Sequence, residues 1–318
     1  MTLPRMRGPD DITAIDAGYV RPQMAAIHLI EHGGRVALVD TGTSHSVPAV
    51  LAALAALGHE PGDVEHVILT HVHLDHAGGA GALMRVLPNA RLAVHPRGAP
   101  HMIDPSKLVT ASIVVYGESL YRELYGEILP IDAARVHATA EGEQLSLAGR
   151  VLEFWFTPGH AMHHQAIVDH ASHTVFTGDT FGLSYREFDT ARGAFILPTT
   201  TPTQFDPQQL EDSVARIAAY RPRAVHLTHY ARVTDVERLA TDMIAQVRAC
   251  AALAQRHADD ADRRDRIRAG LRALLLERSR EHGCTMSEAR FDELLGADLD
   301  LNADGLVAWL ERSARGRA

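Results

Sequence analysis

The chain has 318 residues, of which 46% are hydrophobic and 22% charged, and its formal net charge is −9 at pH 7. The acidic balance argues against a protein that binds nucleic acid through a basic surface. Two cysteines are too few for a disulfide framework or a cysteine metal site. No stretch reaches 18 apolar residues and the first residues lack an apolar signal core, so we expect a cytoplasmic protein without a membrane partner.

Short apolar runs alternate with helical patterns over the first two-thirds of the chain. A hairpin turn at 32–34 is predicted to join strands at 25–30 and 36–40. A helix over 47–58 ends at Gly58, which suits a helix C-cap. Further strands are predicted at residues 64–70, 91–95, 151–156, 165–168, 174–177 and 224–227, and further helices at 107–125 and 207–220, the second capped by Asp206.

Strand patterns almost disappear from residue 235 onward, where Ala, Leu and Arg abound. This composition predicts an all-helical C-terminal extension over 233–318, following a mixed α+β body over 1–232. Its apolar stripes lead us to expect that part of it contributes to a homodimer. The predicted helices of the extension cover residues 235–257, 262–281, 287–295 and 303–313.

Residues 300–311 match the calcium-loop pattern of an EF-hand, from Asp300 to Glu311. No partner hand accompanies them, and Asn302 suits the N-cap of a helix that begins at Ala303. We therefore favour a helical interpretation and leave a calcium site as the alternative.

Three histidines and an aspartate follow the apolar strand at 64–70, namely His71, His73, Asp75 and His76. Side chains two residues apart on an extended chain point to the same side, so His71 and His73 are expected to face one point. Asp75 and His76 turn back toward that point if a helix begins there. These ligand types suit zinc, iron or manganese. The pattern predicts a metal site, with a merely histidine-rich loop as the alternative.

Other predicted strands also end in metal-ligand residues, namely His160, Asp179 and His229. Strand ends that deliver ligands to one edge build rigid metal sites. By contrast, His226 lies inside an apolar strand and is interpreted as a core residue. Asp40 is interpreted as a structural carboxylate rather than a direct ligand. His163 and His164 are interpreted as residues without a functional contact, and support of a ligand or the substrate is the alternative, first for His164.

The ordered residues His71-x-His73-x-Asp75-His76, His160, Asp179 and His229 resemble the metallo-β-lactamase superfamily, and Asp40-Thr41-Gly42 resembles its early turn. The resemblance covers roughly residues 12–232, and it implies an α+β fold, the αββα four-layer sandwich, with a dinuclear site at one edge. It implies two divalent metal ions, zinc first and iron or manganese as alternatives. In that scheme His71, His73 and His160 hold the first metal, Asp75, His76 and His229 hold the second, and Asp179 bridges them.

A bound metal lowers the pKa of water from about 15.7 to about 7, which supplies hydroxide at neutral pH. Asp75 is the predicted catalytic residue, orienting that nucleophile and accepting its proton. We expect a dinuclear-metal-dependent hydrolase of a small ester, thioester or lactone. The alternatives are a mononuclear-iron enzyme of sulfur and oxygen chemistry in the same superfamily, and a non-catalytic metal-containing binding or regulatory protein.

The predicted helix at 107–125 carries an aromatic stripe that includes Tyr116, Tyr121 and Tyr125. We favour a helix that packs this stripe into the core. The alternative is that the stripe covers the site as a lid or lines a substrate pocket.

Overall fold

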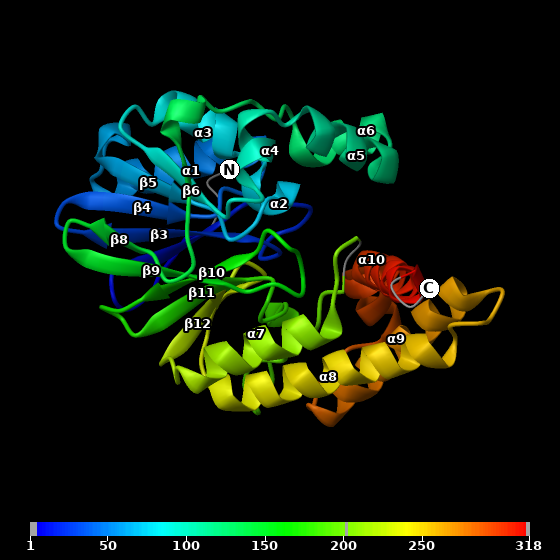
Figure 1. Ribbon diagram of the computed structural model, residues 1–318. Coiled ribbons are helices and arrows are strands. Elements are labelled where there is room, and N and C mark those ends of the chain that lie inside the picture. Colours follow the sequence, from blue (N-terminus) through cyan, green and yellow to red (C-terminus); the bar gives the residue numbers. More distant parts are fainter. Residues whose placement is uncertain (1–4, 201–202, 316–318) are drawn as a thin grey trace. The chain divides into compact units, whose positions relative to one another are not determined.

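The structure is a computed structural model that describes residues 5–200 and 203–315 (Figure 1). Its contacts divide the chain into two compact units that alternate along the sequence. Unit 1 holds the chain up to Phe156 together with 163–178 and 222–233, and unit 2 holds 157–162, 179–221 and the chain from Thr234 onward. The division into domains 1–232 and 233–318 stays a prediction.

Unit 1 is built on two β-sheets. The first sheet has the order β1 to β7, antiparallel from β1 to β4 and parallel from β4 to β7. Its strands are β1 (Arg5–Arg7), β2 (Ile12–Asp16), β3 (Ala26–His32), β4 (Arg35–Val39), β5 (Val64–Ile68), β6 (Arg91–Val94) and β7 (Val136–Ala138).

The second sheet has the order β13-β12-β11-β10-β9-β8. All of its neighbouring strands are antiparallel except β11 and β12, which run parallel. Its strands are β8 (Gln144–Leu147), β9 (Arg150–Phe156), β10 (Gln165–Asp169), β11 (Thr174–Gly178), β12 (Ala224–Leu227) and β13 (Ala231–Val233).

Alternating side chains divide the apolar core of unit 1 into two layers. Ile27 and Leu29 of β3 pack with the helices that cover the first sheet, whereas Ile30 faces the second sheet and packs with Phe154 and Phe176. Figure 1 shows α1, α3 and α4 on the outer face of the first sheet. The helices of unit 1 are α1 (Val47–Leu57), α2 (Leu74–Ala77), α3 (Ala80–Val86), α4 (Ala99–Ile103), α5 (Ser106–Tyr116) and α6 (Glu118–Tyr125).

Unit 2 is helical, with long loops between its segments. Helix α7 packs along α8, while α9 and α10 pack on each other and on α8 (Figure 1). Phe188, from the loop before α7, packs its ring 6.0 Å from that of Phe291 on α10. The helices are α7 (Pro207–Ala219), α8 (Val236–Arg256), α9 (Arg263–Glu281) and α10 (Glu288–Arg315).

Most of the elements predicted from the sequence are present, several within a residue or two of their ends. Gly58 caps α1 in the left-handed conformation, with φ +83°, as predicted. The Asp206 carboxylate accepts a hydrogen bond from the Gln209 amide at the start of α7, also as predicted. The single helix at 107–125 is wrong, because Gly117 adopts φ +75° and separates α5 from α6.

The two short helices predicted at 287–295 and 303–313 are in fact one, α10. Asn302 does not cap a helix but lies inside α10, where its side chain accepts from the Thr200 amide (2.6 Å) and donates to the Pro198 carbonyl (3.2 Å). The EF-hand pattern therefore lies on a helix rather than in a calcium loop. Its carboxylates pair with arginines of α9: Asp300 with Arg264 and Arg268, Asp304 with Arg264, and Glu311 with Arg263.

Two buried histidines, His28 and His226, lie between the sheets against Phe176. The ring centroids of the two histidines are 5.4 Å apart, and that of His226 stacks 4.7 Å from Phe176. The Nε2 atom of His28 has no hydrogen-bond partner within the described part of the chain. Burial lowers the pKa of His28 to about 4 and that of His226 well below its usual value. The core interpretation of His226 is thus confirmed.

This burial makes the stability of the fold sensitive to acid. The unfolded chain binds a proton on residue 28 near pH 6.5, but the folded protein does so only near pH 4. The free energy of unfolding should therefore fall as the pH drops from about 6.5 to about 4, and His28 should have no influence above that window. His28→Leu should remove up to roughly 3 kcal/mol of this loss.

Denaturant titrations at about pH 7.5, 5.5 and 4.5 give the free energy of unfolding of the variant and of the parent. The effect of His28 is the difference between the two pH profiles of that free energy. The control is His32→Ala, because His32 is exposed at the end of the same strand. Parallel profiles for His28→Leu and the parent would contradict the prediction.

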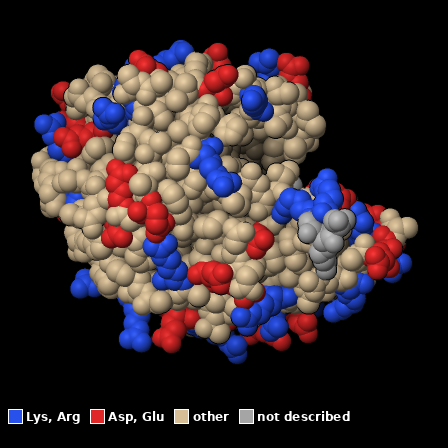
Figure 2. All heavy atoms as spheres, viewed as in Figure 1, with Lys and Arg blue, Asp and Glu red and all other residues tan. Residues whose placement is uncertain are grey.

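Charged side chains of both signs are interspersed on the face shown in Figure 2. Among the described residues, none of the helices combines the length and the apolar character needed to cross a bilayer.

Candidate metal centre

The loop after β5 brings the first two predicted ligands together. The chain leaves the sheet after Ile68, and α2 begins directly after His73, so His71 and His73 lie on the short extended link between strand and helix. The Nε2 atom of His71 lies 2.9 Å from the Nδ1 atom of His73. In a tetrahedral site with metal–nitrogen bonds of about 2.0–2.1 Å, two ligand nitrogens stand about 3.3 Å apart. The two nitrogens of His71 and His73 therefore lie close to the spacing expected of two ligands on one metal ion.

A second cluster in unit 1 joins Asp75, His76 and His229. Their candidate ligand atoms all lie within 4.8 Å of one another. An oxygen of Asp75 lies 3.6 Å from Nε2 of His76 and 3.3 Å from Nε2 of His229. Asp75 and His76 belong to α2, while His229 follows β12, so the two sheets meet at this cluster.

The other ring nitrogen of three of these histidines is held by the protein. Nδ1 of His76 lies 2.9 Å from an oxygen of Asp40, and Nδ1 of His229 donates to the Met24 carbonyl at 2.6 Å. Nδ1 of His71 lies 3.1 Å from Oγ1 of Thr70. A proton fixed on Nδ1 of His76 and His229 leaves Nε2 as a lone-pair donor directed at the cluster. This donor set fits a divalent metal ion such as zinc.

Asp40 lies next to the predicted ligands and binds the residues that position them. Its carboxylate is 1% exposed and accepts from the Thr70 amide (2.8 Å), the Thr70 hydroxyl (2.9 and 3.0 Å) and the Thr228 hydroxyl (2.7 Å), besides its contact with His76. The prediction that Asp40 is a structural carboxylate is therefore confirmed. The carboxylate links the ends of β4, β5 and β12.

The two remaining predicted ligands, His160 and Asp179, belong to unit 2 and lie next to each other. Nε2 of His160 is 3.5 Å from an oxygen of Asp179. The segments that carry them are tied together, because the Thr180 hydroxyl donates to the Thr157 carbonyl at 3.0 Å. The Gly159 carbonyl, which precedes His160, accepts from the Asp206 amide at 2.7 Å.

Two further histidines of unit 1 line the first ligand pair. The ring of His164 stacks 4.9 Å from that of His71, and the ring of His163 lies 5.6 Å from that of His73. Burial, followed by the charges of nearby histidines including His73, lowers the pKa of His163 to about 3. Both rings pack against the loop, which favours the supporting role that the sequence left as the alternative.

Sequence reasoning missed Thr70, Thr228 and the Met24 carbonyl as supports of the centre. The two threonines each precede a predicted ligand, in Thr70-His71 and Thr228-His229, and both follow apolar strands. The repeated Thr-His pair at a strand end is the signal that could have found them. No local pattern marks the Met24 carbonyl.

A tyrosine cluster lies beside Asp75 in unit 1. Tyr121 and Tyr125 are buried in a core cluster with Leu74, as the packing interpretation of their helix predicted. The hydroxyls of Tyr19 and Tyr125 lie 3.1 Å apart. Burial raises the pKa values of Tyr116 and Tyr125, and the negative charge of Asp75 raises both further. These hydroxyls therefore stay protonated and can donate hydrogen bonds.

The model of the metallo-beta-lactamase superfamily matches residues 20–229. The chain belongs to this superfamily.

A relative from Sulfurisphaera tokodaii, metallo-beta-lactamase fold-containing protein ST1585, is 26% identical over 221 residues, which cover 68% of this chain and 77% of the relative. The atrochrysone carboxyl ACP thioesterase of Aspergillus fumigatus is 27% identical, over 51% of this chain and 42% of the relative. A hydroxyacylglutathione hydrolase of Klebsiella pneumoniae is 28% identical, over 48% of this chain and 45% of the relative.

Among solved structures, the metallo-beta-lactamase family protein TTHA1429 of Thermus thermophilus matches with a TM-score of 0.67 at 20% identity, over 96% of this chain and 94% of that one. At this identity the likeness speaks for the fold alone. The predicted fold class is confirmed: the chain is an α+β metallo-β-lactamase fold with two sheets, flanking helices and a helical C-terminal region.

Proposed function

We propose that this protein is a hydrolase of acyl thioesters or related esters and lactones that works with two divalent metal ions. The observation that carries the proposal is the set of five donors in unit 1, three of which are histidines whose outer ring nitrogens are held by Asp40, Thr70 and the Met24 carbonyl. Histidines fixed in this way are characteristic of metal ligands. The donors are His71, His73, Asp75, His76 and His229.

Chain connectivity supports the addition of His160 and Asp179 to this set. His160 is three residues before His163, and three residues span at most about 11 Å. The ring of His163 in turn lies within 5.6 Å of that of His73. Asp179 directly follows Gly178, the last residue of β11. We therefore place His160 with His71 and His73 on the first metal, Asp75, His76 and His229 on the second, and Asp179 between them.

When bound, two such ions supply an acidified water molecule and polarise the carbonyl that is to be cleaved. We assign to Asp75 the orientation of that water and the acceptance of its proton, because a carboxylate can do both and this one lies within the second cluster, 3.3 Å from Nε2 of His229. The protonated hydroxyls of Tyr116 and Tyr125, close enough to Asp75 to sense its charge, are suited to donate to an oxygen of the substrate.

The substrate class is supported by the names of two relatives, one a thioesterase and the other a hydroxyacylglutathione hydrolase. An acyl thioester also combines an apolar chain with a reactive carbonyl. Partly buried apolar residues that pack against the core cluster of Leu74, among them Leu108, Val109 and Leu124, offer apolar surface in the same part of unit 1 as Asp75.

The deciding experiment is metal analysis of freshly purified protein, followed by turnover assays on acyl-coenzyme A thioesters, p-nitrophenyl esters and lactones. Two divalent ions per chain, with thioester turnover that a chelator abolishes and zinc restores, are expected. One iron per chain with oxygen uptake on persulfides would support the mononuclear-iron enzyme instead. A full metal complement without turnover on any substrate would support a binding or regulatory protein.

His160→Ala should lower metal content by about one ion per chain and turnover by about 100-fold or more, because a direct ligand is lost. Asp75→Asn should lower turnover by a similar factor while the first metal stays bound, because the amide cannot accept the proton. Metal analysis and rate measurements on the same samples separate the two patterns. His32→Ala, at an exposed position, should change neither. Unchanged metal content in His160→Ala would remove it from the ligand set.

A further inference from the structure

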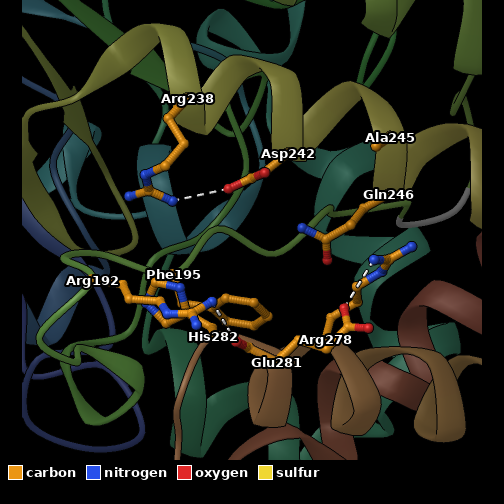
Figure 3. A pocket seen from close by; sticks show the side chains of 9 residues that line it. All are labelled: Arg192, Phe195, Arg238, Asp242, Ala245, Gln246, Arg278, Glu281 and His282. Atoms are coloured by element: carbon orange, nitrogen blue, oxygen red, sulfur yellow. Dashed lines mark hydrogen bonds and ion pairs between the residues drawn. The ribbon is translucent and has the colours of Figure 1, made fainter.

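Unit 2 contains a cavity of about 270 Å³ that the metal chemistry does not use. It lies between α8, the last turn of α9 and the loop at 192–195 (Figure 3). Its volume is just below the range of about 300–1,000 Å³ that is typical of sites for drug-sized ligands, so it suits a smaller molecule. The lining residues are Arg192, Phe195, Arg238, Asp242, Ala245, Gln246, Arg278, Glu281 and His282.

One buried acceptor in this cavity lacks a donor. Gln246 is 4% exposed, and its Nε2 donates to the Ile196 carbonyl at 2.8 Å, which fixes the orientation of the amide. Its Oε1 has no hydrogen-bond partner within residues 5–200 and 203–315. Figure 3 shows this oxygen directed into the space between α8 and the end of α9. Because a buried acceptor without a donor costs about 1–3 kcal/mol, the position favours a ligand that brings an N–H or O–H group.

One guanidinium of the cavity has no carboxylate partner among the described residues. Arg238 pairs with Asp242 at 2.9 Å and with Asp235 at 2.5 Å, and Arg278 pairs with Glu281 at 2.9 Å. Arg192 donates to the main-chain carbonyl of Glu281 at 2.8 Å, and the described residues offer it no carboxylate. A single carboxylate on the ligand would balance Arg192. A phosphate dianion would in addition face the carboxylates of Asp242 and Glu281.

The rigid parts of the cavity hold these groups in place. Arg238, Asp242 and Gln246 recur every four residues and so lie along one face of α8. On the opposite side, the rings of Phe195 and His282 pack with centroids 5.2 Å apart, and Nε2 of His282 lies 3.0 Å from the Gly193 carbonyl. The loop that carries Arg192 is thus attached to the end of α9.

We propose that this cavity binds a free amino acid. Arg192 holds the carboxylate, while Oε1 of Gln246 and the Asp242 carboxylate receive the ammonium group. The site would be distinct from the metal centre, since none of its lining residues is a proposed ligand.

The test is calorimetric titration and thermal melting of the full chain with each of the twenty common amino acids. At least one is expected to bind with a dissociation constant between about 10 μM and 1 mM and to raise the melting temperature by a few degrees. Carboxylic acids and amines that match the bound amino acid but lack one of its two charged groups should bind about 10-fold more weakly or worse. Inorganic phosphate serves as the competing probe.

Two variants address the two recognition groups. Gln246→Leu and Arg192→Met should each weaken binding about 10-fold or more. Ala245→Phe, at an exposed lining position, should block the cavity without removing a polar contact. The matched control is Arg248→Met, because Arg248 is an exposed arginine of α8 outside the lining and pairs with Glu211.

Amino acids also chelate metal ions, so the titration is repeated on chelator-treated protein, where binding should persist. The proposal would be overturned if none of the twenty amino acids binds at a ligand concentration of about 10 mM, which would detect even a weak dissociation constant. Tighter binding of phosphate, loss of binding with the metal, or unchanged affinity in Ala245→Phe and Arg192→Met would also overturn it. None of these results bears on whether the metal centre hydrolyses thioesters.

Discussion

Replacement of Asp40 by alanine should lower the free energy of unfolding by roughly 3–5 kcal/mol and weaken metal binding about 10- to 100-fold. The change removes a buried acceptor that serves the amide and hydroxyl of Thr70, the hydroxyl of Thr228 and Nδ1 of His76. Each donor left without a partner in the core adds its own cost. His76 also loses the contact that fixes its proton on Nδ1. Denaturant unfolding and metal titration measure the two effects.

Asp16→Ala is the matched control for this prediction. Asp16 is equally buried, but within residues 5–200 and 203–315 its oxygens accept only from the amides of Gly18 and Gln23, each at 2.9 Å. It should therefore lower stability without a direct effect on metal affinity. Equal weakening of metal binding by both variants would show that Asp40 acts through general stability alone.

Arg150→Met should cost roughly 3–5 kcal/mol of stability, because it leaves the Asp169 carboxylate charged and buried without its cation. The side chains of Arg150 and Asp169 are 3% and 0% exposed, and Nε of Arg150 donates to both oxygens of Asp169 at 3.1 and 3.2 Å. The pair joins the start of β9 to the end of β10.

The double variant Arg150→Met with Asp169→Leu should recover most of that loss, since a well-packed apolar pair often replaces a buried ion pair at little cost. Denaturant unfolding of the four proteins forms a complete cycle. Arg122→Ala provides the exposed comparison, because Arg122 pairs with Glu118 in solvent and its loss should change stability little. A double variant no more stable than Arg150→Met would refute the account.

One local pattern in the sequence predicted both the strands and the two donor clusters of unit 1. An apolar run followed by histidine or aspartate marked the loop at 71–76 and the positions of His160, Asp179 and His229, because residues that follow strands collect at a sheet edge. The Asp40 network was beyond such patterns: Asp40 and Thr228 are 188 residues apart. Only the closed sheets bring them into contact.

The errors in the helical region have a similar cause. Gly296 and Asn302 are weak helix formers, and they led us to predict two short helices in place of α10. Packing outweighs this local preference, since Phe291, Leu299 and Leu306 are buried along one helix and Asn302 bonds to residues 198 and 200. At Gly117 the error was the opposite, because an aromatic stripe continues across a helix break.

The long separation between Asp40 and Thr228 also sets an order of events during synthesis. A chain leaves the ribosome from its N-terminus, so Asp40 and the loop at 71–76 emerge well before residues 228 and 229. Until β12 joins β11, Asp40 lacks one of its donors and the cluster around Asp75 lacks His229. A nascent chain therefore presents only part of the proposed ligand set, and tight uptake of the proposed metal ions would have to follow the synthesis of residues 228 and 229.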